Sequence, residues 1–393
     1  MTQAAAQSSA SASADVIVVG AGPAGSSAAY HMATLGLDVI LLEKQELGRD
    51  KVCGDGLTPS AVRELVSMGV DTSGWQRNRG LRVIGGGHLL HFPWPEQASF
   101  PSYGMARPRA LLDRDLAEPA AAAGARLLTG VTVTGPVTSP TGRVTGVEAR
   151  PTNRVAYPGI EGPTTFTAPL VVDAGGVSAR LATAVGRIKN ERRPMGVAVR
   201  AYFRSPRAKD AWMESRLELW DGKPGKSDLL PGYGWIWSVG EGLVNVGLGS
   251  VSSRAQATSI DYRAVFNRWM DNVPASWGFT QENQVGGLVS AALPMAFNRK
   301  PHYADGLMLL GDAGGMVSPF NGEGIAQALL SGRLAAQAAA QAAARSTTSG
   351  REQVLAQYPK ALSAEMGGYY TLGRVFVALI EHPEVMRLCT RYG

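Results

Sequence analysis

The sequence predicts an α/β protein, in which a Rossmann-like dinucleotide-binding domain is interrupted by an antiparallel-sheet domain and followed by C-terminal helices. Three stretches support this prediction. Residues 15–44 have the order strand, glycine turn, helix and strand. Residues 194–284 are rich in Trp and Tyr and are broken by Gly and Pro, as in an antiparallel sheet with one covered face. At 307–310 an apolar strand pattern returns, so the parts of the first domain flank the sheet.

The first stretch is a complete nucleotide-binding unit. A β-branched strand over 16–19 leads into a G-x-G-x-x-G turn over 20–25, a helix expected over 26–35 and a second strand over 39–42. The three glycines permit a tight turn, close approach of the backbone to a pyrophosphate and close packing of helix on strand. Glu43 follows where a ribose hydroxyl needs an acceptor. The residues assigned to this site are Gly20, Gly22, Pro23, Ala24, Gly25, Glu43 and Lys44; a chance glycine turn is the alternative.

Composition narrows the class of protein. The 393 residues hold 45% hydrophobic residues, and residues 1–14 look like a disordered tail rather than a signal peptide. Only two cysteines, Cys53 and Cys389, are present, which fits the cytoplasm. The net charge of +6 favours anionic partners such as a membrane surface. Since no basic block alternates with aromatic residues, a nucleic-acid partner is not expected. The histidines lack metal-ligand spacing, so no metal site is assigned.

The remaining elements follow in order. A loop over 48–59 precedes a helix near 60–68, and a helix is expected over 107–123. Strands beginning at 127 and 131 precede a hairpin partner at 144–149, and a buried strand follows at 170–172. Residues 346–393 look like further helices. The predicted domains are a tail over 1–14, a discontinuous nucleotide domain over 15–85, 104–185 and 285–345, a substrate domain over 86–103 and 186–284, and a helical region over 346–393.

Two later segments indicate which dinucleotide is bound. Asp312 follows the strand at 307–310, where its carboxylate can accept hydrogen bonds from a polyol chain. The segment 321–324 opens a long Ala-rich helix over 323–345, whose free amides suit the carbonyl side of a flavin. Together with the first unit, these segments indicate FAD rather than NAD. The residues assigned here are Gly311, Asp312, Gly322, Gly324 and Ile325; the alternative is an Asp N-cap and a Gly-rich connection.

At this point the chain resembles a family. The order of the first unit, the Arg109 helix and the Gly-Asp-Ala segment is similar to the p-hydroxybenzoate-hydroxylase-type FAD superfamily. More narrowly, the loop 51–57 (KVCGDGL), the strand 232–237 (GYGWIW) and the turn 319–325 (PFNGEGI) resemble the geranylgeranyl reductase family. The likeness covers residues 15–393 and is greatest to the actinobacterial branch that saturates one isoprene unit of menaquinone.

This resemblance implies an enzyme, an FAD-dependent oxidoreductase that transfers hydride from reduced flavin to an isoprenoid C=C bond. It places Cys53 at the flavin face, where it assists proton delivery or shapes the pocket. We expect Lys51 and Arg49 to favour its thiolate; a buried inert thiol is the alternative. The further FAD contacts that the resemblance implies are Arg49, Cys53, Gly54, Arg109 and Val133. For Arg109, a surface helix arginine is the alternative.

Aromatic residues are the candidates for the substrate wall. Tyr233, Trp235 and Trp237 alternate, so on a strand they share one face and could line a channel for a prenyl chain. Trp94 and Tyr103 could form another wall. In both cases plain core packing is the alternative. The apolar stretch 366–380 is too short to span a bilayer; it could cover the entrance or lie at a membrane surface, with ordinary helix packing as the alternative.

The chain departs from the family pattern at three places. Gly48 replaces the leading Pro of the cysteine loop, and Trp237-Ser238 replaces Phe-Pro. Residues 174–176 are Ala-Gly-Gly where superfamily members have Ala-Asp-Gly, and this difference weakens the case for direct reduction of the flavin by NADPH. The electron donor therefore stays open between NADPH and a redox protein. The expected partners are a prenyl lipid or menaquinone and the inner face of the cell membrane. A flavin monooxygenase or halogenase is the enzymatic alternative, and a non-catalytic lipid-binding flavoprotein is the other.

Overall fold

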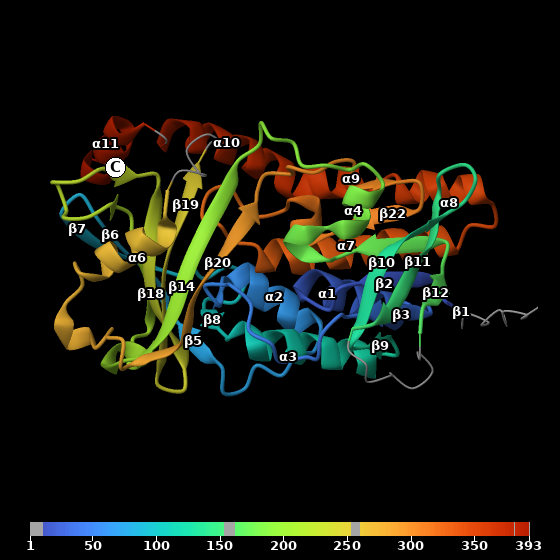
Figure 1. The fold of residues 1–393 in the computed structure, drawn as a ribbon, viewed down its shortest axis with the longest axis horizontal. Coiled ribbons are helices and arrows are strands. Elements are labelled where there is room, and N and C mark those ends of the chain that lie inside the picture. Colours follow the sequence, from blue (N-terminus) through green and yellow to red (C-terminus); the bar gives the residue numbers. More distant parts are fainter. Residues whose placement is uncertain (1–10, 153–161, 253–259, 381, 393) are drawn as a thin grey trace, which may run out of the picture.

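The computed structural model describes residues 11–152, 162–252, 260–380 and 382–392 (Figure 1). Two parts stand side by side in it: a nucleotide-binding part built on a parallel sheet, and a large, mostly antiparallel sheet. Helices of the C-terminal third run along both parts. This arrangement confirms the predicted fold class.

A six-stranded sheet forms the centre of the nucleotide-binding part. Its four central pairings are parallel, and only the edge strand β21 runs antiparallel. In spatial order the strands are β21 (Tyr303–Ala304), β22 (Leu307–Leu309), β13 (Leu170–Asp173), β2 (Val16–Val19), β3 (Val39–Leu42) and β9 (Arg126–Leu128). The short apolar runs of the sequence are thus buried parallel strands, because helices and a second sheet cover both faces.

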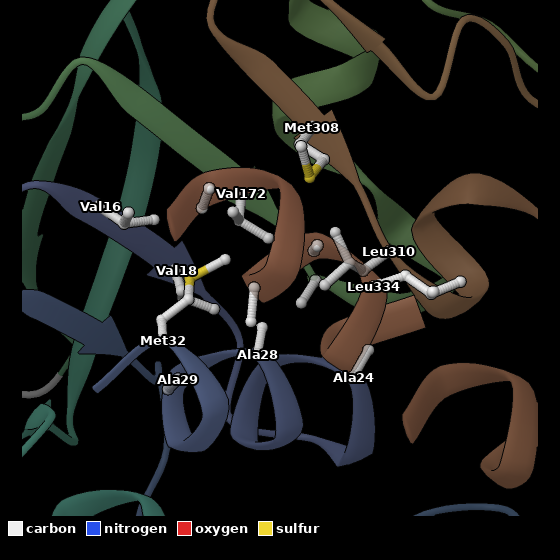
Figure 2. Close-up of a cluster of buried hydrophobic side chains, with 14 of the residues drawn as sticks. Val16, Val18, Ala24, Ala28, Ala29, Met32, Val172, Met308, Leu310 and Leu334 are labelled. Carbon is white, nitrogen blue, oxygen red and sulfur yellow. The ribbon is translucent and has the colours of Figure 1, made fainter. Parts of the chain in front are cut away.

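One face of this sheet is covered by α1 (Pro23–Thr34), α3 (Arg109–Ala122) and α7 (Ile325–Ala343). Helices α1 and α7 approach closely: an added Cβ on Gly332 would lie 2.6 Å from the backbone nitrogen of Ala28. The hydroxyl of Ser27 donates to the carbonyl of Leu329 at 2.7 Å. Small residues on both helices allow this contact, and Figure 2 shows the resulting core around Ala24, Ala28 and Leu334.

The other face carries a four-stranded sheet of β1 (Ser11–Ser13), β12 (Thr164–Thr167), β11 (Val144–Pro151) and β10 (Val131–Thr138). The predicted hairpin is present as β10 and β11. The expected disordered tail lies largely outside the described residues, at 1–10. For Ser11–Ser13 that expectation is wrong, because these residues pair in parallel with Thr165–Thr167.

A seven-stranded sheet makes the second part. Its strands, in spatial order, are β20 (Gln284–Pro294), β14 (Met195–Arg204), β19 (Leu243–Ser252), β18 (Gly232–Gly240), β15 (Trp212–Arg216), β6 (Gly80–Gly85) and β7 (His88–Pro93). All pairs are antiparallel except β15 with β6. Helix α6 (Tyr262–Met270) packs on one face. The predicted boundaries at 85/86 and 284/285 are therefore wrong, because β6 and β20 both belong to this sheet.

Shorter elements complete the chain. A three-stranded sheet joins β4 (Gly56–Leu57), β8 (Gly104–Ala106) and β5 (Gln76–Asn78), next to α2 (Pro59–Ser67). The remaining short elements are β16 (Leu219–Trp220), β17 (Leu229–Leu230), α4 (Arg180–Ala184) and the 3-10 turns η1 (Gly176–Ser178), η2 (Pro206–Lys209), η3 (Ala275–Trp277) and η4 (Gly311–Gly314).

The expected C-terminal helices are present as α8 (Thr348–Leu355), α9 (Tyr358–Leu362), a π-turn η5 (Ser363–Gly367), α10 (Gly368–Ile380) and α11 (Pro383–Tyr392). Figure 1 shows α10 and α11, in red, along one long edge of the molecule, from the nucleotide-binding part to the seven-stranded sheet. Within the described ranges, each helix is too short or too polar to cross a bilayer.

Candidate active site

A cavity of about 1030 Å³ lies between the two parts of the molecule. It contains most of the residues that the sequence assigns to the cofactor and the substrate. These lining residues are Gly20, Gly22, Pro23, Ala24, Glu43, Lys44, Arg49, Cys53, Gly54, Trp94, Arg109, Val133, Tyr233, Trp235, Trp237, Asp312, Gly322, Gly324 and Ile325. Three assigned residues do not line it: Gly25, Gly311 and Tyr103.

The glycine turn between β2 and α1 forms one wall. Gly20 has φ +102°, and an added Cβ there would lie 2.5 Å from the carbonyl oxygen of Ala174. An added Cβ on Gly25 would lie only 1.8 Å from the carbonyl oxygen of Gly20, so Gly25 serves the packing of helix on turn. By contrast, an added Cβ on Gly22 meets only Lys51 Nζ at 3.6 Å and Arg109 at 4.0 Å. Gly22 thus leaves its side-chain space to whatever occupies the cavity.

Glu43 directly follows β3, beside this turn. Its Oε2 accepts a hydrogen bond from the backbone N–H of Ala21 at 3.0 Å, and its Oε1 accepts one from Gln45 at 3.1 Å. The carboxylate is almost fully buried yet still lines the cavity. It therefore holds the turn against the neighbouring strand and keeps an acceptor at the cavity wall.

Two cations share one carboxylate beneath Gly22. Lys51 Nζ lies 2.5 Å from Oδ2 of Asp113, and the Arg109 guanidinium lies 2.7 Å from Oδ1. Burial alone would raise the pKa of Asp113, but Arg109 and Lys51 hold it below its usual value. The Asp113 carboxylate offsets one of the two positive charges, so this cluster of three residues keeps one net positive charge. Arg109 is mostly buried, which contradicts the surface-arginine alternative.

The cysteine loop spans the cavity between the glycine turn and the seven-stranded sheet. The carbonyl of Cys53 accepts from Asn245 Nδ2 at 3.0 Å, and the carbonyl of Gly54 accepts from Trp237 Nε1 at 2.5 Å. The backbone N–H of Asp55 donates to the Cys53 sulfur at 3.2 Å. The sheet thus fixes the position of the thiol from behind.

The expected Cys53 thiolate is wrong. Burial raises the pKa of the Cys53 thiol, and the nearby Arg109 guanidinium opposes that rise without reversing it. Lys51, which was expected to help, is instead paired with Asp113. Cys53 is half-buried at the cavity wall, and the hydration lost there disfavours the charged thiolate, so the thiol form is favoured.

Asp55 is a site residue that sequence reasoning missed. Its Oδ2 accepts from the Tyr202 hydroxyl at 2.5 Å and from Asn245 Nδ2 at 2.8 Å, and its Oδ1 accepts from the backbone of Arg109 at 3.1 Å. Burial raises its pKa to about 6, although these hydrogen bonds oppose the rise. Its place between two loop glycines was the only local signal, because its partners lie on distant strands.

The alternating aromatic residues of β18 share one face, as expected, and line the cavity. Trp235 stacks on Trp237 at 5.8 Å between ring centroids, and Tyr233 lies 6.1 Å from Trp235. Their polar atoms are satisfied by protein: Trp235 donates to Asn245, and the Tyr233 hydroxyl donates to the carbonyl of Asn321. The ring faces that remain form an apolar wall.

The second expected aromatic wall is only partly present. Trp94 lines the cavity, and its Nε1 donates to Asn78 at 2.7 Å. Tyr103 instead packs against a core cluster that includes α2, with the Arg77 guanidinium 4.3 Å from the centroid of its ring. The expectation for Tyr103 is therefore wrong, because its ring packs against this cluster and Arg77 and does not line the cavity.

The start of α7 and the segment before it line another part of the cavity. Asp312 lines it, and burial raises the pKa of this carboxyl while Arg109 and Lys51 work against the rise. Gly311 does not line the cavity; an added Cβ would meet Ala24 at 3.0 Å and Ala328 at 3.3 Å. Gly311 thus serves the packing of α1 and α7, whereas Asp312 presents an acceptor.

The acid that superfamily members carry after the strand corresponding to β13 is absent at position 175 of this chain. Position 175 carries no side chain, and the preceding Asp173 carboxylate accepts backbone N–H groups of Gly175 at 2.9 Å and Ala182 at 3.0 Å. Asp173 thereby holds the turn that leads into α4. Gly175 and Gly176 line the cavity with backbone only.

The residues present fit an FAD molecule. Gly22 leaves room for close backbone approach, and Lys51 with Arg109 supplies positive charge beside it. The buried Nε of Arg49, which also lines the cavity, has no hydrogen-bond partner among the described residues. A buried donor without a partner is costly, so a ligand acceptor there is favoured. Asp312 and Glu43 offer acceptors for hydroxyls.

Comparisons with known proteins support FAD as the cofactor. The sequence profile of the family described as "FAD binding domain" matches residues 13–361. The chain is 35% identical to the menaquinone reductase of Mycolicibacterium smegmatis over 95% of its length and 86% of that protein's. It is 28% identical to digeranylgeranylglycerophospholipid reductase 1 of Methanothermobacter thermautotrophicus, over 90% and 83% of the two chains.

Solved structures show the same fold. A geranylgeranyl bacteriochlorophyll reductase-like protein from Thermoplasma acidophilum matches with a TM-score of 0.79 and 24% identity, over 97% of this chain and 91% of that one. The myxobacterial chondrochloren halogenase matches with a TM-score of 0.72 and 21% identity, over 92% and 82%. With the family match over most of its length and the 35% identity to a menaquinone reductase, the chain belongs to the FAD-binding flavoproteins and, within them, to the geranylgeranyl reductase family.

Proposed function

We propose that this protein uses FAD to saturate an isoprenoid C=C bond, with the prenyl side chain of menaquinone as the preferred substrate. One observation carries the proposal: a single cavity joins the glycine turn to the aromatic face of β18. The cysteine loop bridges the two ends, since Lys51 lies beside Gly22 and Gly54 is bonded to Trp237. The names of the relatives support the substrate class.

The chain's own residues have distinct tasks in this reaction. When bound and reduced, FAD supplies the hydride. Trp235 and Trp237 exclude water and present π faces, which stabilise cation character on an alkene carbon. Cys53 holds a proton at Sγ, because burial keeps its thiol protonated, and that proton is placed to complete the saturated bond. The Gly20–Gly25 turn, Lys51 and Arg109 hold the pyrophosphate.

The decisive experiment uses the purified holoprotein, reduced anaerobically with dithionite and incubated with menaquinone. We expect a product heavier by two hydrogens in the mass spectrum of the extracted quinone. Cys53→Ala should keep FAD and slow saturation by about 10²-fold or more, the usual contribution of a positioned acid. A saturated product formed at an unchanged rate by Cys53→Ala would remove Cys53 from the mechanism.

The halogenase likeness supports a second candidate, a flavin monooxygenase or halogenase on a lipidic or aromatic substrate. Oxygen chemistry requires rapid oxidation of NADPH in air and an oxygenated or halogenated product. An absence of saturated product in the anaerobic assay, together with such a product in air, would establish this candidate. A non-catalytic lipid-binding flavoprotein would retain FAD and ligand but form neither product.

We further propose a donor other than directly bound NADPH, because the 175 position lacks an acid and Asp173 is committed to backbone amides. After anaerobic mixing with NADPH, the spectrum of oxidised flavin should persist for much longer than one catalytic turnover takes. Rapid bleaching of that spectrum would contradict this proposal. Since a prenyl quinone resides in the bilayer, we also propose that the protein works in the cytoplasm, attached peripherally to the inner face of the membrane.

A further inference from the structure

Helix α10 presents a continuous apolar stripe to solvent. One side of the helix packs inward through Tyr370, Gly373 and Val377, which are buried. The opposite side exposes five large apolar side chains at helical spacing: Tyr369 (47% exposed), Leu372 (62%), Val375 (54%), Phe376 (36%) and Leu379 (50%). Isolated exposed apolar residues need no explanation, but five on one helix face form a patch that favours a partner.

This stripe lies at the edge of the active-site cavity. Phe376 is both exposed and part of the cavity lining, and so the cavity reaches the surface at α10. Its ring packs on Phe320, another lining residue, at 5.3 Å between centroids, and Tyr369 packs on Phe320 at 4.5 Å. The entrance to the apolar wall is therefore framed by apolar surface rather than by charges.

The neighbouring helix α11 extends the patch and adds positive charge. Leu388 and Tyr392 are 60% and 74% exposed and one turn apart. Arg387 and Arg391 are exposed and each stands one residue before them, although the Arg387 guanidinium also lies 5.7 Å from the centroid of the Trp220 ring. Arg374 adds a further positive charge on α10. Among the described residues of α10 and α11 the one acidic residue is Glu384, and Glu365 lies in η5 just before α10. The two helices run along one edge of the molecule (Figure 1).

We propose that α10 and α11 form a docking face for an anionic lipid bilayer, and that a prenyl chain enters the cavity from that bilayer past Phe376. The docking face is defined by Tyr369, Leu372, Val375, Phe376, Leu379, Leu388 and Tyr392. An amphipathic helix with an apolar stripe and basic flanks lies in the interface plane, with its apolar side chains among the acyl chains and its arginines at the phosphates. This inference rests on the proposed function for its substrate, though not for its partner.

The test is cosedimentation of the holoprotein with vesicles of phosphatidylglycerol and phosphatidylcholine, compared with vesicles of phosphatidylcholine alone. The variant is Leu372→Glu/Leu379→Glu, and the matched control is Leu35→Glu/Val66→Glu. The control replaces residues of similar exposure (53% and 57%) outside the docking face. All proteins must show the same FAD absorbance and thermal midpoint, which establishes that each is folded.

We expect the wild type and the control to bind the anionic vesicles, and the α10 variant to bind at least about 30-fold more weakly, since two leucines leave the acyl region. Binding should also weaken with phosphatidylcholine alone and at about 0.5 M NaCl, because the arginine attraction is screened. Equal binding by the α10 variant and the control would overturn the proposal. A second result would also overturn it: a wild-type protein that binds no vesicles but forms dimers, which the α10 variant does not form. The face would then join two copies of the chain.

The same preparation separates this inference from the proposed function. The wild type is assayed with a detergent-dispersed prenyl quinone, where no bilayer is needed. If the α10 variant loses vesicle binding but the wild type forms no saturated product, the docking face is supported and the reductase function is rejected. If the wild type forms saturated product and the α10 variant binds vesicles as well as the wild type does, the reductase function is supported and the docking face is rejected.

Discussion

The hydroxyl of Tyr202, on β14, donates a 2.5 Å hydrogen bond to Oδ2 of Asp55, in the loop that carries Cys53. This contact joins residues 147 positions apart and fixes the loop against the seven-stranded sheet. Asn245 strengthens the same junction, since its amide donates both to Asp55 and to the carbonyl of Cys53. The position of the thiol is therefore set by a buried polar network rather than by the loop alone.

Asp55 should make the stability of the protein depend on pH. Its pKa is about 6 in the folded protein and 3.8 in a model peptide, so between these values the folded state binds more protons than the unfolded state. The free energy of unfolding should thus fall as pH rises through this window, by about 3 kcal/mol in total. Asp55→Asn should abolish this contribution, and Glu282→Gln, at the surface, should not. Urea unfolding at several pH values measures it; identical pH slopes for wild type and Asp55→Asn would contradict the assignment.

Tyr202→Phe tests the same junction from the other side. Burial and the Asp55 carboxylate both raise the pKa of Tyr202, so its hydroxyl stays protonated and acts as the donor. Removal of this donor should lower the free energy of unfolding by about 1–3 kcal/mol and lower the rate of saturation, while FAD remains bound. Tyr262→Phe is the matched control, because the buried Tyr262 hydroxyl has no partner among the described residues. An equal effect of both substitutions would mean that the Asp55 contact carries no special weight.

Two glycines of one turn should respond differently to substitution. Gly22→Val should fold as the apoprotein yet fail to bind FAD, because an added Cβ meets only ordinary contacts at 3.6 Å and 4.0 Å but occupies the space for a pyrophosphate. Gly25→Val should impair folding itself, because the Cβ would overlap the carbonyl of Gly20. Flavin absorbance and thermal melting after refolding without FAD separate the two effects. A yellow Gly22→Val protein would refute the assignment of the turn.

Cys53 should react slowly with alkylating agents at neutral pH. Burial raises the pKa of its thiol, and the thiolate is the reactive form. With iodoacetamide near pH 7, labelling of the Cys53 peptide should be slower than that of an unstructured cysteine peptide, and it should accelerate as pH rises. Peptide mass spectrometry assigns the label, with Cys53→Ala as the control. Labelling faster than that of the free peptide would restore the thiolate that the sequence suggested.

The amino-acid sequence by itself determined the local features of this protein. These are the glycine turn, Glu43 directly after β3, and the Gly-Asp segment before α7. Each depends on residues adjacent in the chain, so its geometry can be inferred from spacing. The apolar runs likewise predicted the parallel strands, and the alternation of β18 predicted its shared aromatic face. These features sufficed for the fold class and for FAD.

Tertiary structure alone decided how those features combine. The pairing of β6 with β15 places β6 in the seven-stranded sheet, beyond the predicted domain boundary. The packing of Tyr103 against a core cluster and Arg77 keeps it out of the cavity lining. Lys51 forms an ion pair with Asp113. The basic residues near Cys53 in the sequence therefore did not predict the protonation state of the Cys53 thiol. Asp55 gained its role from Tyr202 and Asn245, which no local pattern links to it. Burial and charge pairing arise between segments far apart in the chain, and for that reason a pKa or a strand partner emerges only once the chain has folded.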